Sequence, residues 1–199
     1  MSVPVTTLPR SLRRTLKVSD WFEQLAAHHG DSAAHSLRVA GLARLIAREL
    51  QCPEEMCALA YEAGLLHDIG KINVDVAVLG KAGPLSDGEY AAVRQHAEDG
   101  GSLLADDPTM TEIAEVAAQH HERLDGTGYP LQLAGDEIGL LPRIVAVADT
   151  YDAITAARQY SPAQPREVAL TELRACSPSA FDPKVVEALA RALEADPSL

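Results

Sequence analysis

Two aspartates interrupt apolar stretches of this sequence, and a chain that buries them must also supply partners for them. Asp68 follows Leu66 and His67, and Asp149 follows the apolar run 144–148. A carboxylate in an apolar interior is costly unless a cation or hydrogen-bond donors compensate its charge. A divalent metal ion would compensate both carboxylates and would also use the neighbouring imidazole. The two positions therefore favour a fold that closes around metal ions.

Five of the seven histidines lie inside or at the ends of predicted helices, although histidine is not a favoured helix residue. These five are His35, His67, His96, His120 and His121. Each alone is typical of a core or surface histidine, and we assign the pair His28-His29 to a surface or a helix end. Together with the two aspartates they exceed the needs of one ion, so we expect two metals. Imidazole and carboxylate ligands without thiolate favour iron or manganese, and such a pair holds a bridging hydroxide and supports phosphoester hydrolysis.

The spacing of apolar residues predicts an all-α fold of about seven helices. No window shows the alternation of a β-strand. The expected helices span about 31–50, 53–67, 86–96, 110–122, 144–154, 165–175 and the residues from 182 onward. Asp31 or Ser32 is available as an N-cap, and Ser86 with Glu89 forms a capping box. The stretch 125–130 is too rich in glycine for a helix or strand and predicts a loop.

Length and charge limit the organisation and the partners of the chain. With 199 residues we expect one domain, over 19–199, after a basic N-terminal tail over 1–18 that is either solvated or a docking arm. The net charge of −12 argues against nucleic-acid binding, although metal ions can still attract a small anion. An odd number of cysteines, three, and the lack of a signal peptide or an apolar span predict a cytoplasmic protein that does not bind membranes.

The ordered set of motifs resembles the HD-GYP phosphodiesterases. In chain order the matching segments are His35-Ser36, His67-Asp68-Ile69-Gly70-Lys71, His96, His120-His121-Glu122-Arg123, Asp125-Gly126-Thr127-Gly128-Tyr129-Pro130 and Asp149-Thr150-Tyr151-Asp152-Ala153. The resemblance runs from about Trp21 to Ala195. It implies a helical HD-superfamily bundle, a centre of two or three iron or manganese ions, and hydrolysis of cyclic di-GMP to linear pGpG or on to GMP. Residues 19–199 are then the catalytic domain.

The resemblance also implies roles for individual residues. The implied metal ligands are His35, His67, Asp68, His96, His120, His121 and Asp149. Asp68 is implied to bridge two ions, Lys71 to meet the scissile phosphate, and Tyr129 and Arg158 to contact the substrate. Asp31 stands one turn before His35, where members with a third metal place a glutamate, and its position is explained equally well by an N-cap.

One departure from the family pattern keeps two alternatives open. Ser161 stands where the family usually has a second basic residue, just after the arginine and tyrosine that match Arg158 and Tyr160. One electrostatic contact with the substrate is therefore missing. The first alternative is hydrolysis of another phosphoester, such as a hybrid cyclic dinucleotide or a mononucleotide. The second is a non-catalytic module that binds cyclic di-GMP or a protein partner. A homodimer is also left open.

Overall fold

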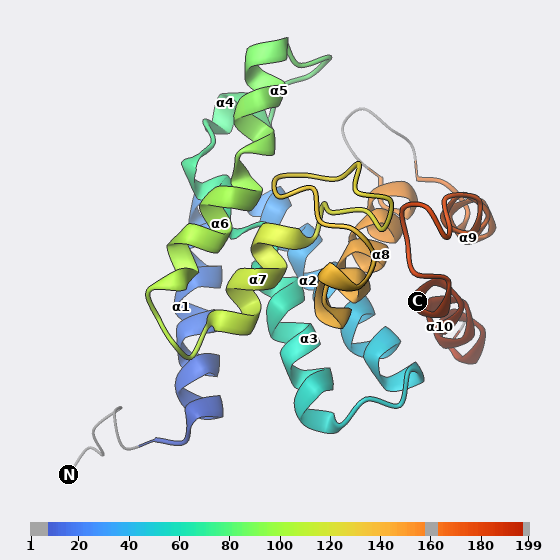
Figure 1. Cartoon of the computed structure of the whole chain (residues 1–199). Coiled ribbons are helices and arrows are strands. Elements are labelled where there is room, and N and C mark those ends of the chain that lie inside the picture. The colour runs from blue at the N-terminus through green and yellow to red at the C-terminus, as the bar shows by residue number, and fades with distance from the viewer. Residues whose placement is uncertain (1–7, 158–162, 197–199) are drawn as a thin grey trace.

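The computed structural model describes residues 8–157 and 163–196, and these residues are almost entirely helical (Figure 1). The elements are α1 (Arg10–His28), α2 (Gly30–Glu49), α3 (Glu54–Leu66), the 3-10 helix η2 (Ile69–Asn73), α4 (Val76–Leu79), α5 (Asp87–Arg94), α6 (His96–Ala105), α7 (Thr111–Gln119), the 3-10 helix η3 (Gly135–Glu137), α8 (Leu140–Thr155), α9 (Arg166–Ala175) and α10 (Pro183–Ala195). The expected all-α class is confirmed, with more helices than the seven expected.

Local capping explains several helix boundaries. Ser86 and Glu89 form the expected capping box of α5, and Asp182 caps α10 by accepting from the backbone N–H of Lys184. The N-cap of α2 differs from the prediction. The His29 side chain, not Asp31 or Ser32, caps this helix by accepting from the backbone N–H of Ser32. A neutral imidazole nitrogen can accept this bond as a hydroxyl or carboxylate oxygen would.

Part of the predicted N-terminal tail is helical, because α1 begins at Arg10 and includes the basic residues. Arg14 donates to Glu62 of α3 at 2.5 Å, and Thr15 donates to the same carboxylate at 2.6 Å. Val18 and Leu25 are buried against the core. The first half of α1 is therefore part of the folded domain.

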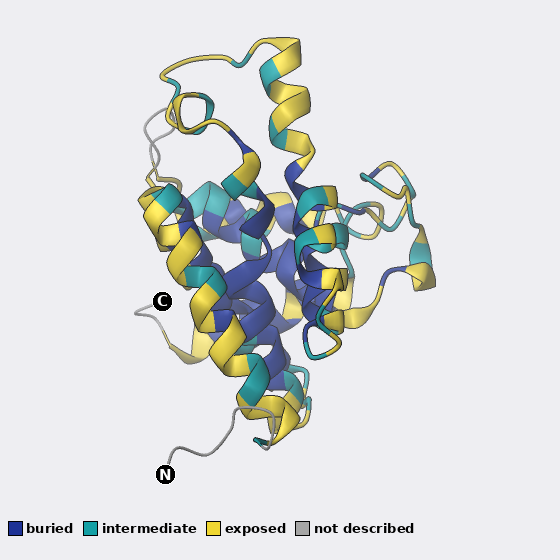
Figure 2. Cartoon of the chain, turned by 90° about the vertical axis from the view of Figure 1, so that its left-hand side faces the viewer, coloured by how far each residue is buried: buried dark blue, intermediate teal, exposed yellow. Residues whose placement is uncertain are grey.

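Helices α2 and α3 form the centre of the bundle. α2 packs against α1, α3, α8 and α10, and α6 packs against α7 and η2. Figure 2 shows these central segments buried, while the outer face of α1 and most of α5 are exposed. In Figure 1, α4 and α5 extend from one end of the bundle as an arm. The C-terminal ends of α3 and α7, which lead into His67 and His120, lie close to the start of α6, where His96 is located.

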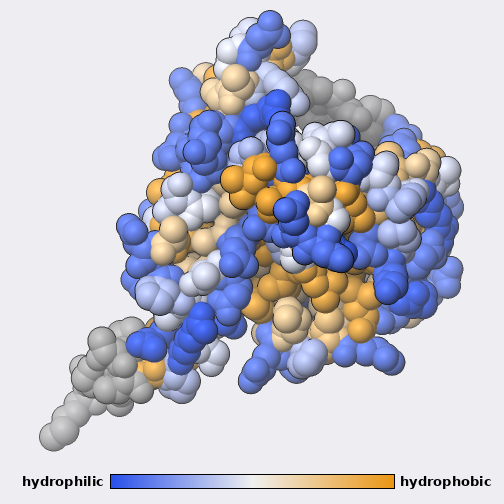
Figure 3. Space-filling model, viewed as in Figure 1, coloured by the Kyte–Doolittle hydropathy of each residue, from blue (hydrophilic) through white to orange (hydrophobic). Residues whose placement is uncertain are grey.

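The face of the molecule seen in Figure 3 carries many polar side chains, in keeping with the acidic composition. Figure 3 shows hydrophilic side chains around the edge of one face and hydrophobic ones gathered where α3, α7 and α8 meet. Among the described residues, every helix is too short or too polar to cross a lipid bilayer.

Candidate metal centre

Five helices bring the seven predicted ligands together. His35 lies on α2, His96 begins α6 and Asp149 lies on α8. His67 and Asp68 link α3 to η2, and His120 and His121 directly follow α7. All are buried except His121 and Asp149, which are partly buried. Several of these polar side chains lie at helix ends inside the bundle. The apolar faces of the helices can therefore pack, while the imidazoles and carboxylates lie close together in the interior.

Four of the imidazoles lie beside Asp68, two near each of its carboxylate oxygens. Asp68 Oδ2 lies 3.8 Å from Nε2 of His35 and 3.5 Å from Nε2 of His67. Asp68 Oδ1 lies 3.2 Å from Nε2 of His96 and 4.0 Å from Nε2 of His120. A carboxylate placed in this way has the geometry of a bridge between two ions.

Each group offers three ligand atoms that lie within 4.8 Å of one another. One group is His35, His67 and Asp149, and the other is His96, His120 and His121. Within the first group, Asp149 Oδ1 lies 3.0 Å from Nε2 of His35 and 3.9 Å from Nε2 of His67. These are donor sets of the kind that hold first-row transition metals.

The hydrogen bonds of the imidazoles support a metal in both groups. Nδ1 of His67 donates to the Gly64 carbonyl at 2.8 Å, and Nδ1 of His120 donates to the Ala117 carbonyl at 3.0 Å. A neutral imidazole with its proton on Nδ1 has a lone pair on Nε2. Nε2 of His67 is fully buried and has no hydrogen-bond partner among the described residues, and Nε2 of His120 faces that of His96 at 3.2 Å. Cations between these nitrogens would satisfy them.

Burial keeps most of the imidazoles neutral. Desolvation lowers the pKa of His67, lowers that of His120 further, and lowers that of His121 to about 4. Neutral imidazole is the form that binds metal ions.

His35 differs, because burial lowers its pKa but hydrogen bonds to Asp149 and Asp152 outweigh this effect and raise it to about 9. Burial raises the pKa of Asp68, but the ammonium of Lys71 beside it outweighs burial, so its pKa lies well below the usual range. Burial likewise opposes ionisation of Asp149, and the hydrogen bond with His35 lowers its pKa. Both aspartates therefore carry negative charge that can bind cations.

The sequence did not predict the hydrogen-bond partner of His35 Nδ1 or the arginine that holds this partner. Nδ1 of His35 donates to Asp152 Oδ2 at 2.6 Å, and Arg38 holds the same carboxylate with Nε at 2.6 Å and Nη2 at 2.9 Å. The position of Asp152 three residues after Asp149, on nearly the same helix face, was the only sequence signal for this contact.

An open pocket of about 480 Å³ lies beside the cluster and contains basic side chains. His35, Lys71, Arg38 and Lys81 line it, with residues of the α4–α5 arm on its far wall. Lys71 forms an ion pair with Asp68, and its ammonium is partly exposed. Asp31 also lines this pocket but is exposed and belongs to none of the ligand groups found among the described residues. The pocket has the size of a small-molecule site.

The glycine-rich loop is fixed over the second ligand group by Glu122. Its buried carboxylate accepts from the backbone N–H groups of Leu131, Gln132 and Leu133 at 2.6, 3.1 and 3.1 Å. A Cβ on Gly128 would lie 2.4 Å from Cα of Glu122, so only glycine fits this approach. Glu122 therefore sets the path of the loop that carries Tyr129.

Tyr129 lies between a metal-ligand candidate and a cation. Its ring stacks on His121 with centroids 4.7 Å apart, and the guanidinium of Arg94 lies 4.1 Å above it. Cation–π contacts of this kind stabilise an aromatic ring in place. The loop thus holds Tyr129 next to the cluster, and Arg158, the other predicted substrate contact, lies outside the described residues with Tyr160 and Ser161.

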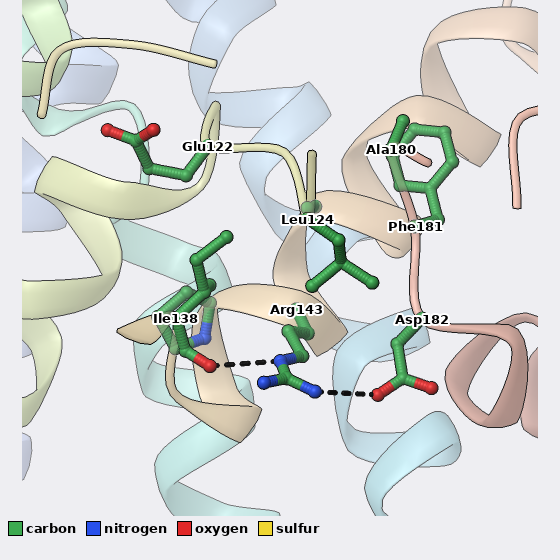
Figure 4. Close-up of a pocket in the computed structure, with 9 residues that line it drawn as sticks. Glu122, Leu124, Ile138, Arg143, Ala180, Phe181 and Asp182 are labelled. Carbon is green, nitrogen blue, oxygen red and sulfur yellow. Dashed lines mark hydrogen bonds and ion pairs between the residues drawn. The ribbon is translucent and has the colours of Figure 1, made fainter. Parts of the chain in front are cut away.

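A second, much smaller cavity lies on the other side of Glu122 and serves the structure of the loop. Figure 4 shows Arg143 between the Ile138 carbonyl and Asp182, with hydrogen bonds of 2.9 and 3.0 Å, while Glu122 points away from it. The cavity holds about 10 Å³, which is at most one water molecule. Arg143 therefore fastens the end of the loop to the start of α10.

The chain matches known proteins over most of its length. The family model described as HD domain matches residues 20–185. The chain is 42% identical over 162 residues to 3'3'-cGAMP-specific phosphodiesterase 3 of Vibrio cholerae and 41% identical over 160 residues to the cyclic di-GMP phosphodiesterase PA4108 of Pseudomonas aeruginosa. These matches cover 81% and 80% of the chain but only 35% and 38% of the relatives.

The structural comparison gives the same fold. The crystal structure of the cyclic GMP-AMP specific phosphodiesterase V-cGAP3 of Vibrio cholerae superposes with a TM-score of 0.62 at 34% identity. The superposition covers 94% of this chain and 42% of that one. The chain thus corresponds to one part of these longer proteins.

Proposed function

Since the chain belongs to the HD-domain family, we propose that it is a metal-dependent phosphodiesterase that hydrolyses cyclic di-GMP to linear pGpG or on to GMP. The observation that carries the proposal is the placement of two three-ligand groups on opposite oxygens of one buried carboxylate, Asp68. The names of the two curated relatives support a cyclic dinucleotide as substrate. Three unpaired cysteines support a cytoplasmic location.

We expect two iron or manganese ions. His35, His67 and Asp149 would hold one, His96, His120 and His121 would hold the other, and Asp68 would bind both. When bound, such ions lower the pKa of coordinated water and neutralise charge on a reacting phosphate. Asp31 stays a candidate ligand for a third ion.

The chain itself would orient the substrate. The ammonium of Lys71 lies at the junction of the cluster and the open pocket, where it would meet one non-bridging phosphate oxygen. Arg38 and Lys81 also line the pocket, where Arg38 is paired with Asp152 and Lys81 with Glu89. Tyr129, which adjoins His121, would contact the substrate from the loop side.

The proposal is tested by metal analysis and product identification on the full chain, purified without oxygen and without added metal. We expect about two ions of iron or manganese per chain and conversion of cyclic di-GMP to pGpG or GMP, identified by chromatography and mass spectrometry. A single zinc ion, or no bound metal, would contradict the binuclear centre. Binding of cyclic di-GMP without hydrolysis by the metal-loaded chain would support the non-catalytic alternative.

A second candidate substrate is the hybrid dinucleotide 3'3'-cGAMP. The observation that favours it is the 42% identity to a phosphodiesterase named as specific for this compound. Both substrates should therefore be assayed side by side. A kcat/KM for cGAMP well above that for cyclic di-GMP would assign the chain to the hybrid substrate.

A further inference from the structure

His35 is held in a different way from the three other imidazoles with a hydrogen-bonded Nδ1 in the cluster. His67, His96 and His120 each donate from Nδ1 to a backbone carbonyl three residues earlier, at 2.8, 2.5 and 3.0 Å. Those carbonyls belong to the same turn as the histidine, so the helix itself sets the ring orientation. His35 donates instead to the side chain of Asp152, which lies 117 positions away on α8.

Asp152 is itself held tightly. Its side chain is only 4% exposed, and both of its oxygens are bound by Arg38, one by Nε and the other by Nη2. A side-on pair of this kind fixes the plane of the carboxylate as well as its position. Arg38 lies on α2, three residues after His35. The hydrogen bonds from His35 and Arg38 to Asp152 therefore connect two positions on α2 to one position on α8.

The orientation of His35 has a direct consequence for its other nitrogen. With Asp152 accepting at Nδ1, Nε2 lies 3.0 Å from Asp149 Oδ1 and 3.8 Å from Asp68 Oδ2. When a metal takes Nε2, the proton that stays on the ring is the one donated to Asp152. Carboxylates that accept from a ligand imidazole fix its tautomer and raise its basicity, and their loss typically costs about 10–100-fold in metal affinity.

We propose that Asp152, fixed by Arg38, is the positioning residue for the metal ion bound by His35, His67 and Asp149. The inference rests on the proposed function, because it requires that this group binds a metal. It makes the two ions unequal. Two ligands of one ion, His96 and His120, are oriented by backbone carbonyls, whereas His35, a ligand of the other ion, is oriented by the Asp152–Arg38 ion pair between α8 and α2.

The test is a calorimetric titration of the metal-stripped full chain with Mn²⁺. It compares the wild type with Asp152→Asn, Asp152→Ala and Arg38→Ala. We expect one of two Mn²⁺ ions to lose about 10–100-fold in affinity in Asp152→Ala while the other is unchanged, with smaller losses in Asp152→Asn and Arg38→Ala. Arg44→Ala is the matched control, because Arg44 lies on the same helix and, within the described part of the chain, its ion pair is with the exposed Glu54. It should bind both ions as the wild type does.

A purely structural tie between α2 and α8 gives a different result. Thermal unfolding and far-ultraviolet circular dichroism of each variant show whether the fold persists. If Asp152→Ala does not fold, Asp152→Asn still provides the test, because asparagine keeps the shape of the side chain. Lower thermal stability with both Mn²⁺ affinities unchanged in every folded variant would overturn the inference and leave the proposed function intact. A wild-type chain that binds no Mn²⁺ would instead overturn the proposed function and the inference with it.

Discussion

Asp68 is the residue on which both ligand groups depend. Its oxygens face His35 and His67 on one side and His96 and His120 on the other. We expect Asp68→Ala to lose most bound metal and all measurable hydrolysis, while helix content stays near that of the wild type because helix packing, not the cluster, forms the core. Elemental analysis, a hydrolysis assay and circular dichroism measure the three effects.

The control for this variant is Asp106→Ala, which removes the same charge from an exposed position at the end of α6. It should keep wild-type metal content and activity. Two tightly bound ions in Asp68→Ala would rule out a shared carboxylate.

Lys71 permits a second prediction, because its ammonium pairs with Asp68 but offers no lone pair to a metal. Lys71→Ala should keep both metals and lower kcat by about a hundredfold, the scale of one lost transition-state contact. Steady-state kinetics and elemental analysis on the same preparation separate the two effects. Lys184→Ala, an exposed lysine on α10, serves as the control, and metal loss in Lys71→Ala would contradict the assignment.

At this scale the sequence predicted which side chains meet but not what holds them. All seven predicted ligands lie close together, because their motifs lie on or next to helices whose apolar faces pack against one another. That they bind metal stays a prediction. Arg38 and Asp152 were missed as partners because 114 positions separate them. A contact of that kind depends on how α2 and α8 pack, which no local pattern encodes.

Helix identity was predictable wherever apolar residues recurred at helical spacing over several turns. The observed α3, α8, α9 and α10 all lie within a few residues of their expected ranges. The sequence failed at α1, because its basic residues resemble a solvated tail and the partner of Arg14, Glu62, lies 48 positions away. It also missed α6, which follows the expected helix 86–96 and contains Gly100 and Gly101, because glycine is a poor helix former.

The contact between η2 and α6 gives a prediction at the level of elements. A Cβ on Gly70 would lie 2.0 Å from the His96 carbonyl oxygen and 2.6 Å from the Gly100 nitrogen, so Gly70→Ala must push the two elements apart. We expect a loss of about 1–3 kcal/mol in the free energy of unfolding, the cost of overpacking, together with weaker metal binding as Asp68 moves away from His96. Urea denaturation and Mn²⁺ titration measure these changes.

Gly88→Ala is the matched control for this substitution. A Cβ at Gly88, on the exposed α5, meets open space, and alanine favours a helix more than glycine does. This variant should be as stable as the wild type or slightly more so, with unchanged metal affinity. A Gly70→Ala chain with wild-type stability and affinity would show that η2 can shift without disturbing the cluster.

For the whole molecule, metal binding should be a source of stability because the ligands come from five different helices of the bundle. The two groups join α2, α3, α6, α7 and α8, and the unfolded chain offers no preformed site. A ligand held at about 100 times its Kd stabilises the native state by about 2.7 kcal/mol. For a chain of this size, each kcal/mol shifts Tm by about 2–4 °C.

We therefore expect removal of the metals with a chelator to lower Tm by about 5–10 °C, measured by thermal unfolding of the full chain with and without added Mn²⁺. Restoring Mn²⁺ should return the original Tm, because the helices and their apolar contacts persist without the ions. The Asp68→Ala variant is the control, and its Tm should not respond to chelator. If the wild type and this variant respond equally, the stabilising ion binds outside the cluster, and the ligands of α2, α3, α6, α7 and α8 do not act as one centre.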